Sequence, residues 1–167
     1  MANLVSAIRV KAVIAQAAFS TAEEALVASL CAVVSSLVRS FTQRELDAGI
    51  YEEWVSGSGG KRLLVRHYPI VAVASVFPRG SGVEISGYEV ERSRGILWRN
   101  ANWSKGERNL RVTYTAGFDP LPEDLVEACA QWAAALFWQS KDNPAETPHL
   151  PPLAIRQALS PYRRRSW

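Results

Sequence analysis

The stretch that most resembles a ligand-binding motif is residues 57–62, "GSGGKR", where glycines precede a lysine as they do in phosphate-binding loops. A P-loop also requires a glycine six residues before that lysine, a serine or threonine directly after it, and then a helix. Here Val55 and Arg62 occupy those two positions, and a β-type run follows. We therefore predict that this stretch is the turn of a hairpin.

A second candidate is residues 110–128, "LRVTYTAGFDPLPEDLVEA", where an alternating run passes through a glycine and two prolines into an acidic helix start. Glu123 and Asp124 lie in the first helical turn, where they would repel a phosphate. Gly117 is expected to supply a turn, and the prolines to fix the entry of the helix. The stretch is predicted to be a joint between sheet and helix.

The other titratable residues form no catalytic or metal-binding pattern. His67 and His149 have no cysteine nearby and no HExxH spacing. Glu52 and Glu53 are adjacent on a β-type run and so point to opposite faces, which prevents them from acting as a pair on one substrate. The sequence therefore predicts a protein that is not an enzyme and that uses no cofactor and no metal ion.

Composition indicates a single globular domain with appendages. The 167 residues are 48% apolar and 21% charged, which is ordinary for a folded chain. The net charge of +3 equals the three arginines at 163–165, which indicates an interaction tail rather than a DNA-reading face. Cys31 and Cys129 lie in apolar helical patterns, so we expect buried, reduced thiols and a reducing cytoplasm.

Neither export nor membrane insertion is expected from the N-terminal part of the chain. Arg9 and Lys11 precede a small-residue run, 12–15, that is too short for the apolar region of a signal peptide. The uncharged run 25–38 falls short of the roughly 20 apolar residues that a bilayer-spanning helix needs.

The first long helix is predicted over residues 21–41. Ser20 or Thr21 followed by Glu23 and Glu24 indicates a capping box, and apolar residues follow at helical spacing. The remaining face is made of small residues rather than charged ones, which is a first indication of contacts between subunits. These residues are Ser29, Ala32, Ser36 and Ser40.

The middle of the chain, residues 50–115, is predicted to be an antiparallel β meander, because its short β-type runs are separated by glycine-rich turns with no room for crossover helices. The expected strands are 51–55, 62–67, 70–77, 83–85, 88–91, 96–99 and 110–115.

A second helix is predicted over 122–139, with a proline at its first position. The proline-rich segment 140–152 is expected to be a linker, followed by a short amphipathic helix and a basic, aromatic tail. We therefore expect an α+β fold in which two main helices pack on the meander, with an extended C-terminal arm. The predicted division is a core domain over 1–139 and a linker and docking arm over 140–167.

The order of these parts resembles the head-to-tail connector, or adaptor, proteins of long-tailed double-stranded DNA bacteriophages. The resemblance covers most of residues 21–165, and residues 1–20 and 140–152 depart from the family pattern. It rests on "AEEALVASLCAVVSSLVRSFTQREL", "HYPIVAVASVF", "GYEVERSRGILW", "NW", "LRVTYTAGFDPLPEDLVEA" and "LSPYRRR".

The resemblance implies a structural virion protein of the neck that is assembled in the host cytoplasm. It implies a ring of copies, commonly dodecameric, between the portal protein and the next neck or tail protein. Double-stranded DNA would pass through the lumen without sequence readout, and no membrane would be involved. In such proteins the C-terminal arm typically docks on the portal.

Two sets of residues are candidates for these contacts. For portal docking we expect arginines that pair with carboxylates and aromatic anchors. They are Tyr162, Arg163, Arg164, Arg165 and Trp167. The rival use of these arginines is contact with DNA phosphates in the lumen. For the subunit interface we expect Leu26, Leu30, Val34, Trp132 and Trp138.

The alternative function is a small nucleic-acid-binding module. In that case the β meander would grip single strands by stacking bases on exposed tryptophans beside cations. The residues concerned are Trp98 and Trp103, with Arg99, Lys105 and Arg108.

Overall fold

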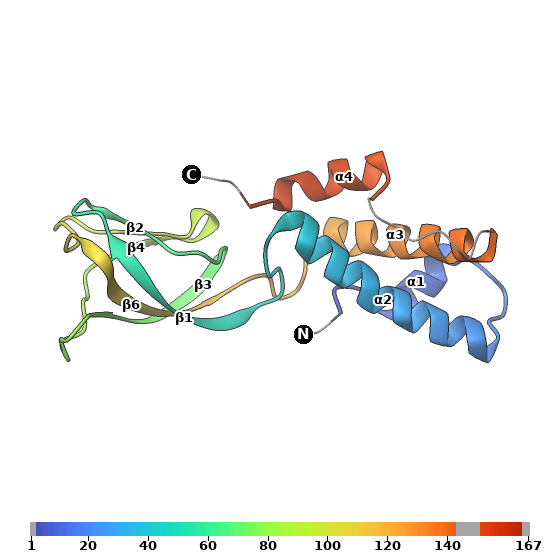
Figure 1. The fold of residues 1–167 in the computed structure, drawn as a ribbon, viewed down its shortest axis with the longest axis horizontal. Coiled ribbons are helices and arrows are strands. Elements are labelled where there is room, and N and C mark those ends of the chain that lie inside the picture. The colour runs from blue at the N-terminus through green and yellow to red at the C-terminus, as the bar shows by residue number, and fades with distance from the viewer. Residues whose placement is uncertain (1–2, 143–150, 165–167) are drawn as a thin grey trace. The chain divides into compact units, whose positions relative to one another are not determined.

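The chain forms two compact units in a computed structural model that describes residues 3–142 and 151–164 (Figure 1). Unit 1 comprises the described residues of Met1–Arg44 and Pro120–Trp167, and it is helical. Unit 2 is Glu45–Asp119 and contains the strands. The predicted α+β class is confirmed, and the strand-rich unit is inserted in the chain between two helices of the helical unit.

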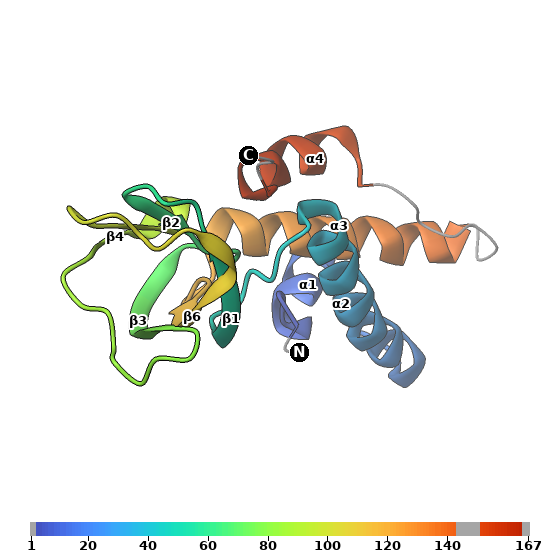
Figure 2. The same cartoon turned by 60° about the vertical axis from the view of Figure 1, so that its left-hand side comes forward.

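Unit 1 is built around one central helix, α3. Its described helices are α1 (Ala7–Ile14), α2 (Thr21–Thr42), α3 (Glu123–Asp142) and α4 (Leu153–Leu159), followed by the 3-10 turn η2 (Ser160–Tyr162). Helix α3 contacts each of the other three helices and lies between α4 on one side and α1 with α2 on the other (Figures 1 and 2). The predicted helices at 21–41 and 122–139 are confirmed, as is the short helix after the linker.

The apolar stripes of α2 and α3 form the core of unit 1. The buried residues of α2 recur at helical spacing at Val27, Cys31, Val34 and Val38, and those of α3 at Leu125, Cys129, Trp132 and Leu136. Both cysteines are free and buried, as predicted. Burial raises the pKa of the Cys129 thiol to about 12, so this group stays protonated and packs as a small apolar side chain.

Helix α1 was not predicted from the sequence. It has 8 residues and no acidic residue in its first turn, so its signal is weak. The features that identify it are a serine cap, in which Ser6 Oγ accepts a bond from the Arg9 N–H, and buried Val10 and Ile14 one turn apart. Arg9 then joins α1 to α3 through an ion pair of 2.7 Å with Glu127.

Helix α2 begins with the predicted capping box, at Ser20. The Ser20 Oγ accepts a hydrogen bond from the Glu23 N–H, and the Glu23 carboxylate accepts one from the Ser20 N–H at 2.8 Å. Lys141, in the last turn of α3, forms an ion pair of 2.5 Å with Glu23. Glu23 therefore both caps α2 and links α2 to α3 through an ion pair.

The interaction between Glu23 and Lys141 is expected to weaken as the pH falls through a defined range. Hydrogen bonds from Lys141 and then from Ser20 lower the pKa of Glu23 to about 2, from an ordinary value of 4.5. Because the folded-state pKa is depressed, the stabilisation is complete above about pH 4.5 and is lost as the pH falls towards 2. We expect the Glu23→Gln variant to melt below the wild type at pH 7, with the difference in Tm shrinking below pH 4.5.

Thermal melts of both proteins between pH 7 and pH 3 measure this difference. Glutamine keeps the acceptor of the capping box, so the comparison isolates the charge. The exposed Glu84→Gln variant changes the net charge equally and is the control. A Tm difference for Glu23→Gln that stays constant down to pH 3 would contradict the prediction.

Helix α2 is long and apolar enough to cross a membrane, by length and composition alone. It is longer than the uncharged run 25–38, which on its own is too short for a membrane span. Its buried residues, however, lie against other helices of unit 1, and Glu23 and Glu24 occupy its first turn. An apolar helix of this length also occurs where a helix packs against several others.

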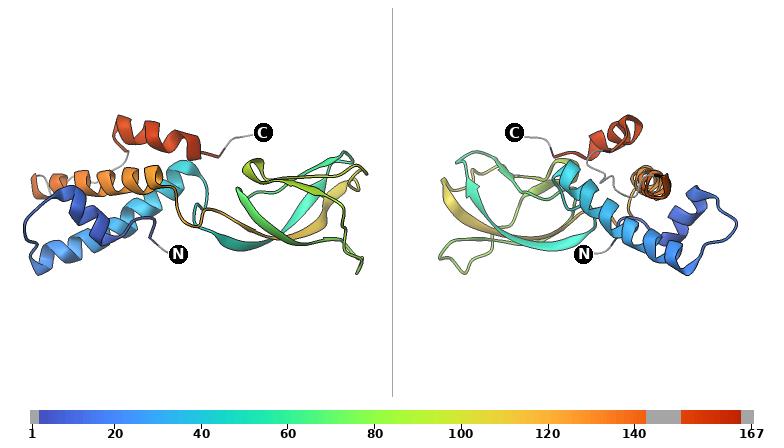
Figure 3. Two further views of the ribbon diagram at one scale, coloured as in Figure 1. Left: turned by 180° about the vertical axis from the view of Figure 1, so that it is seen from behind. Right: turned by 45° about the vertical axis from the view of Figure 1, so that its right-hand side comes forward.

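Unit 2 consists of two three-stranded antiparallel sheets. One has the order β1-β6-β3 and the other β2-β5-β4. The strands are β1 (Gly49–Gly57), β2 (Arg62–Leu64), β3 (Ile70–Pro78), β4 (Glu89–Glu91), β5 (Ile96–Trp98) and β6 (Gly106–Ala116), and the 3-10 turn η1 (Arg92–Arg94) precedes β5. The sheets lie as two layers (Figure 3).

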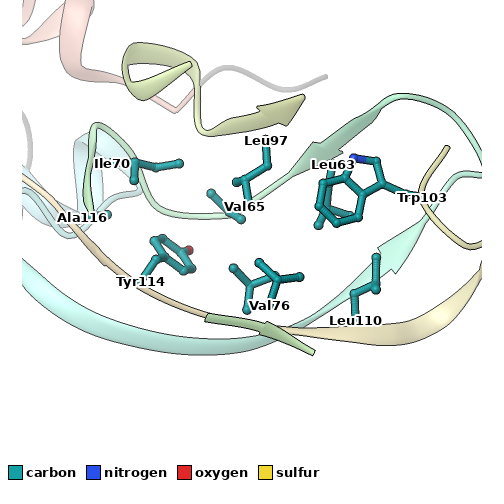
Figure 4. Packing of buried hydrophobic residues seen from close by; sticks show 10 residues of the cluster. Leu63, Val65, Ile70, Val76, Leu97, Trp103, Leu110, Tyr114 and Ala116 are labelled. Atoms are coloured by element: carbon teal, nitrogen blue, oxygen red, sulfur yellow. The ribbon is translucent and has the colours of Figure 1, made fainter. Parts of the chain in front are cut away.

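A single hydrophobic core fills the space between these layers. Alternate residues of β6 are buried, as expected for a strand with one face on the core. Leu63 of β2 and Leu97 of β5 face them from the other sheet (Figure 4). The cluster is Leu63, Val65, Ile70, Val76, Leu97, Trp103, Leu110, Val112, Tyr114 and Ala116.

The predicted meander is wrong in its connectivity. The strands are antiparallel as expected, but β6 pairs with β1 and β3, and only β4 and β5 are both consecutive and paired. The predicted turn at 57–62 consequently joins two sheets and is not a hairpin. The expected strand at 83–85 is absent from the described structure, and Val83 there is 74% exposed. Short β-type runs identify strands but do not encode which distant strands pair.

The joint at 110–128 has the predicted character. Gly117 has φ +114, and a Cβ there would lie 2.4 Å from the backbone oxygen of Asp47. The Gly117 N–H donates to the oxygen of Pro69 at 2.9 Å, and Phe118 exchanges backbone bonds with the segment around Asp47. Glycine is required because the chain turns here in close contact with another backbone segment.

Candidate docking site

The described part of the predicted docking arm is folded against the helical unit. Helix α4 follows Pro152, whose oxygen accepts the first helical bond from Arg156 N–H at 2.9 Å. Ile155 and Leu159, one turn apart, are buried at 5% and 0% exposure and form the side that contacts α3. This segment is therefore helical rather than extended, and it places Tyr162, Arg163 and Arg164 against unit 1.

Tyr162 is held by two polar contacts. Its hydroxyl donates a hydrogen bond of 2.6 Å to Asp124 Oδ1 in the first turn of α3, and its backbone oxygen accepts one of 3.2 Å from Arg44 Nη1. Burial, and then the bond to Asp124, raises the pKa of Tyr162 well above its ordinary value. The phenol is therefore protonated at neutral pH and acts as a hydrogen-bond donor.

Arg163 and Arg164 lie at the C-terminal end of α2. The Arg163 guanidinium carbon is 5.2 Å from the centre of the Phe41 ring, and the Arg164 N–H donates to the oxygen of Thr42 at 2.8 Å. The end of a helix carries unsatisfied carbonyls and partial negative charge, which favours two arginines there. Both residues are exposed.

The structure thus brings together Tyr162, Arg163 and Arg164 of the predicted docking set. The other two members, Arg165 and Trp167, lie outside the described residues, as do His149 and most of the predicted linker. The contacts of the three described residues with Asp124, Phe41 and Thr42 could not be read from the sequence, since their partners are far away along the chain.

The predicted subunit-interface residues divide into buried and accessible ones. Leu30, Val34 and Trp132 are 8%, 0% and 1% exposed within unit 1, so their side chains serve the unit's own core. Leu26 is half-buried, and Trp138 is 45% exposed with Lys141 Nζ at 5.3 Å from its ring centre. Only these last two present apolar surface to a neighbour.

The small-residue face of α2 is uncovered in the described structure. The predicted face, which is Ser29, Ala32, Ser36 and Ser40, is exposed, and Val33 beside it is 40% exposed. A solvated helix face ordinarily carries Lys and Glu, and small side chains allow a neighbouring element to approach closely. This face and Trp138 are therefore uncovered surfaces of unit 1 at which another copy could approach.

The alternative site on unit 2 loses its stacking tryptophan. Trp103 is 1% exposed, its Nε1 donates to the oxygen of Lys61 at 3.2 Å, and Arg99 lies 5.1 Å from its ring centre. A base has no access to this ring, and Trp98 is itself half-buried beneath Lys61. Of the residues considered for nucleic-acid binding, the cations Arg99, Lys105 and Arg108 remain as candidates.

The most polar internal cluster of unit 2 surrounds Tyr114. Its hydroxyl donates to Glu53 Oε1 at 2.8 Å and accepts the His67 N–H at 3.0 Å, and His67 stacks on Tyr51 at 3.8 Å between ring centres. Burial raises the pKa of Tyr114 well above its ordinary value. These contacts attach the segment before β3 to the sheet. Glu52 is exposed on the opposite side, as predicted.

Solved structures with a similar fold are those of particle necks and virions. The chain is similar to one in the neck of an empty GTA particle computed with C6 symmetry, with a TM-score of 0.62, 16% identity, and coverage of 96% of this chain and 90% of that chain. A chain in the neck of a native GTA particle computed with C12 symmetry has a TM-score of 0.60 and 16% identity, with coverage of 86% of this chain and 84% of that chain. A chain in the virion of a native gene transfer agent (GTA) particle has a TM-score of 0.66 and 14% identity, with coverage of 96% of this chain and 90% of that chain.

At these identities the similarity demonstrates a shared fold. The chain thus shares the α+β architecture of chains found in particle necks. The family follows from a separate comparison. Residues 4–164 match the model of the head completion protein family, and the chain belongs to that family.

Family membership confirms the class indicated by the sequence, a virion protein of the head-to-tail connection. The family and the proteins of similar fold are structural components of virions rather than enzymes. A comparison with curated protein sequences finds no match.

Proposed function

We propose that the protein is a structural component of the virion neck that assembles as a ring between the portal and the tail and continues the DNA channel. The observation that carries this proposal is membership of the head completion protein family over residues 4–164. The ring would be dodecameric, it would contact the next neck or tail protein, and double-stranded DNA would pass through it without sequence readout.

The structure supports the ring by the surfaces that unit 1 leaves uncovered. The exposed small-residue face of α2 and the exposed Trp138 of α3 lie on two different helices of one subunit. Different patches that meet from copy to copy make a head-to-tail contact, and a head-to-tail contact generates a closed ring when its rotation closes. The C6 and C12 symmetries of the similar necks agree with this geometry.

For portal docking we infer a role for the end of the arm. The exposed side chains of Arg163 and Arg164 would pair with portal carboxylates, while the bonds of Tyr162 hold the segment in place. Arg165 and Trp167 would extend the same contact. We therefore propose a division of the chain by function, with a core over residues 1–139 and a docking arm over residues 140–167.

The test is attachment to purified portal-bearing heads that lack their neck. We expect the wild-type protein to co-sediment with these heads and to appear as a ring beneath the portal in electron micrographs. The Arg163→Glu/Arg164→Glu variant is expected to lose at least about tenfold in affinity, since each reversed charge also repels its partner.

Two comparisons make this test specific. The Arg92→Glu/Arg94→Glu variant changes the charge equally on unit 2 and should attach normally. Truncation after Pro152 is a poorer test, because it also removes buried Ile155 and Leu159. Normal attachment of the Arg163→Glu/Arg164→Glu protein would rule out the docking role, and failure of the wild type to bind any portal-bearing head would rule out the proposed function.

A further inference from the structure

One end of unit 2 carries more positive charge than the chain as a whole. The loop that leaves β1 and the segment between β5 and the start of β6, residues 57–62 and 98–109, contain a single carboxylate, Glu107. Their cations are Lys61, Arg62, Arg99, Lys105 and Arg108. Five cations against one carboxylate give these two segments, the basic end, a formal charge of +4, compared with +3 for the entire chain. Glu89 of β4, which pairs with Trp98, places one negative charge beside them. The tail arginines therefore do not account for the distribution of charge.

Backbone hydrogen bonds around buried Trp103 hold the two segments of the basic end together. The Trp103 N–H donates to Gly60 O at 2.8 Å, and the Arg99 N–H donates to Lys61 O at 3.0 Å. The Trp103 indole adds its own bond to Lys61 O. The cations thus stand on segments whose backbone is fixed, and little ordering would be required when a ligand binds.

Asn109 fixes the other side of the basic end. Its Oδ1 accepts the Gly57 N–H at 2.8 Å, and its Nδ2 donates to Ser104 O at 2.9 Å. A Cβ on Gly57 would lie 1.9 Å from Ser104 O, so the two segments are in direct backbone contact. Arg108, at φ +45, is held by a bond from its N–H to Ser56 Oγ at 3.0 Å.

The cations of the basic end form no ion pairs within the described part of the chain. By contrast, Arg9, Lys11 and Lys141 of unit 1 are all ion-paired. Lys61 and Arg99 lie over tryptophan rings, and Lys105 and Arg108 are exposed. A cluster of unpaired cations raises the local concentration of anionic partners.

The composition of the basic end favours nucleic acid over an acidic protein. None of the exposed large apolar side chains of the described structure lies in 57–62 or 98–109, whereas the centres of protein interfaces are rich in aromatic and apolar anchors. Serine, asparagine and backbone N–H groups accompany the cations, as they do where proteins contact phosphates. Because Trp103 is buried, stacking on single-stranded bases has no platform here.

We propose that the basic end of unit 2 binds the phosphate backbone of double-stranded DNA without reading its sequence. The proposal rests on the proposed function, since a neck ring is what brings DNA to the protein, and it names the surface that meets the DNA. In a ring the contact is repeated by every copy, so a weak contact in one subunit becomes a strong one in the assembly.

The experiment measures binding of the full-length protein to a short fluorescent DNA duplex by polarisation, between about 50 and 200 mM salt. The test variant is Lys61→Gln/Lys105→Gln/Arg108→Asn, in which asparagine suits the positive φ of Arg108. The control is Arg66→Gln/Arg92→Gln/Arg94→Gln, which removes the same charge from exposed positions of unit 2 outside the two segments.

We expect the wild type to bind with a steep salt dependence, and the test variant to bind about tenfold or more weakly at the lowest salt. Each lost phosphate contact lowers the slope of log K against log salt by about 0.9, so the slope should fall by about 2 to 3. The control should change much less. Two sequence-scrambled duplexes should bind equally.

Three outcomes would overturn the proposal: no salt-dependent binding by the wild type, equal losses in test and control variants, or competition by polyglutamate as effective as by DNA. The last outcome would assign the surface to an acidic protein. Attachment of the test variant to portal-bearing heads separates this failure from failure of the proposed function, because the ring should still assemble on the portal.

Discussion

Replacing Gly117 with alanine is expected to lower the free energy of unfolding by about 3 kcal/mol or more, enough to unfold most of a marginally stable protein at physiological temperature. The residue has φ +114, and the new Cβ would lie 2.4 Å from Asp47 O and 2.7 Å from Ala48 Cα. Both neighbours are backbone atoms, so relief requires the chain to move at the point where unit 2 closes. Chemical denaturation measures the loss directly.

Gly80→Ala is the matched control. Gly80 also has a positive φ, +76, but a Cβ there would meet nothing within 4 Å. This variant should lose only the conformational cost of about 1 to 2 kcal/mol. Losses of equal size at the two positions would show that the close approach at Gly117 contributes nothing.

The second large effect separates two tryptophans that the sequence placed in one interface. Trp132 is 1% exposed and Trp138 is 45% exposed on the same helix. We expect Trp132→Ala to cost about 3 to 5 kcal/mol of unfolding free energy, because it leaves a large cavity in the core of unit 1. Trp138→Ala should cost less than about 1 kcal/mol in the isolated chain and should instead reduce ring formation.

Denaturation of the monomer and mass photometry of the assembled protein measure the two effects. Trp138→Phe, which keeps an aromatic surface, should retain most of the assembly. If Trp138→Ala left assembly unchanged, this tryptophan would be excluded from the subunit interface. If Trp132→Ala were as stable as the wild type, the described packing of α3 would be wrong.

Local features of the fold were predictable because their causes lie within a few residues. The Ser20 and Glu23 cap, the stripe of α2 and the joint at Gly117 each depend on neighbours in sequence or on a backbone angle that only glycine adopts readily. The class of protein was predictable from the order of such features. Strand pairing was not predictable from the sequence. Strand β6 pairs with β1 along one edge and with β3 along the other, and the paired residues are more than 30 positions apart in the chain.

The candidate surfaces show the same division. The basic and aromatic character of residues 162–164 is visible in the sequence, but their attachment to Asp124, Phe41 and Thr42 depends on the folded helices. The basic end of unit 2 was hidden for the same reason. Its cations come from two segments about 40 residues apart, and the Trp103 that joins them was an exposed stacking platform only in the alternative interpretation of the sequence.

The insertion of unit 2 between α2 and α3 has a mechanical consequence. The chain passes from one unit to the other twice, after Arg44 and before Pro120, so any tension between the units is divided over two covalent crossings. Next to these crossings, Leu46 and Ala48 exchange backbone bonds with Phe118, so the entering and leaving chains are also tied to each other. A protein placed between a pressurised head and a tail would gain tolerance from this arrangement, since a single break in a loop of unit 2 would leave both fragments bonded to the helices.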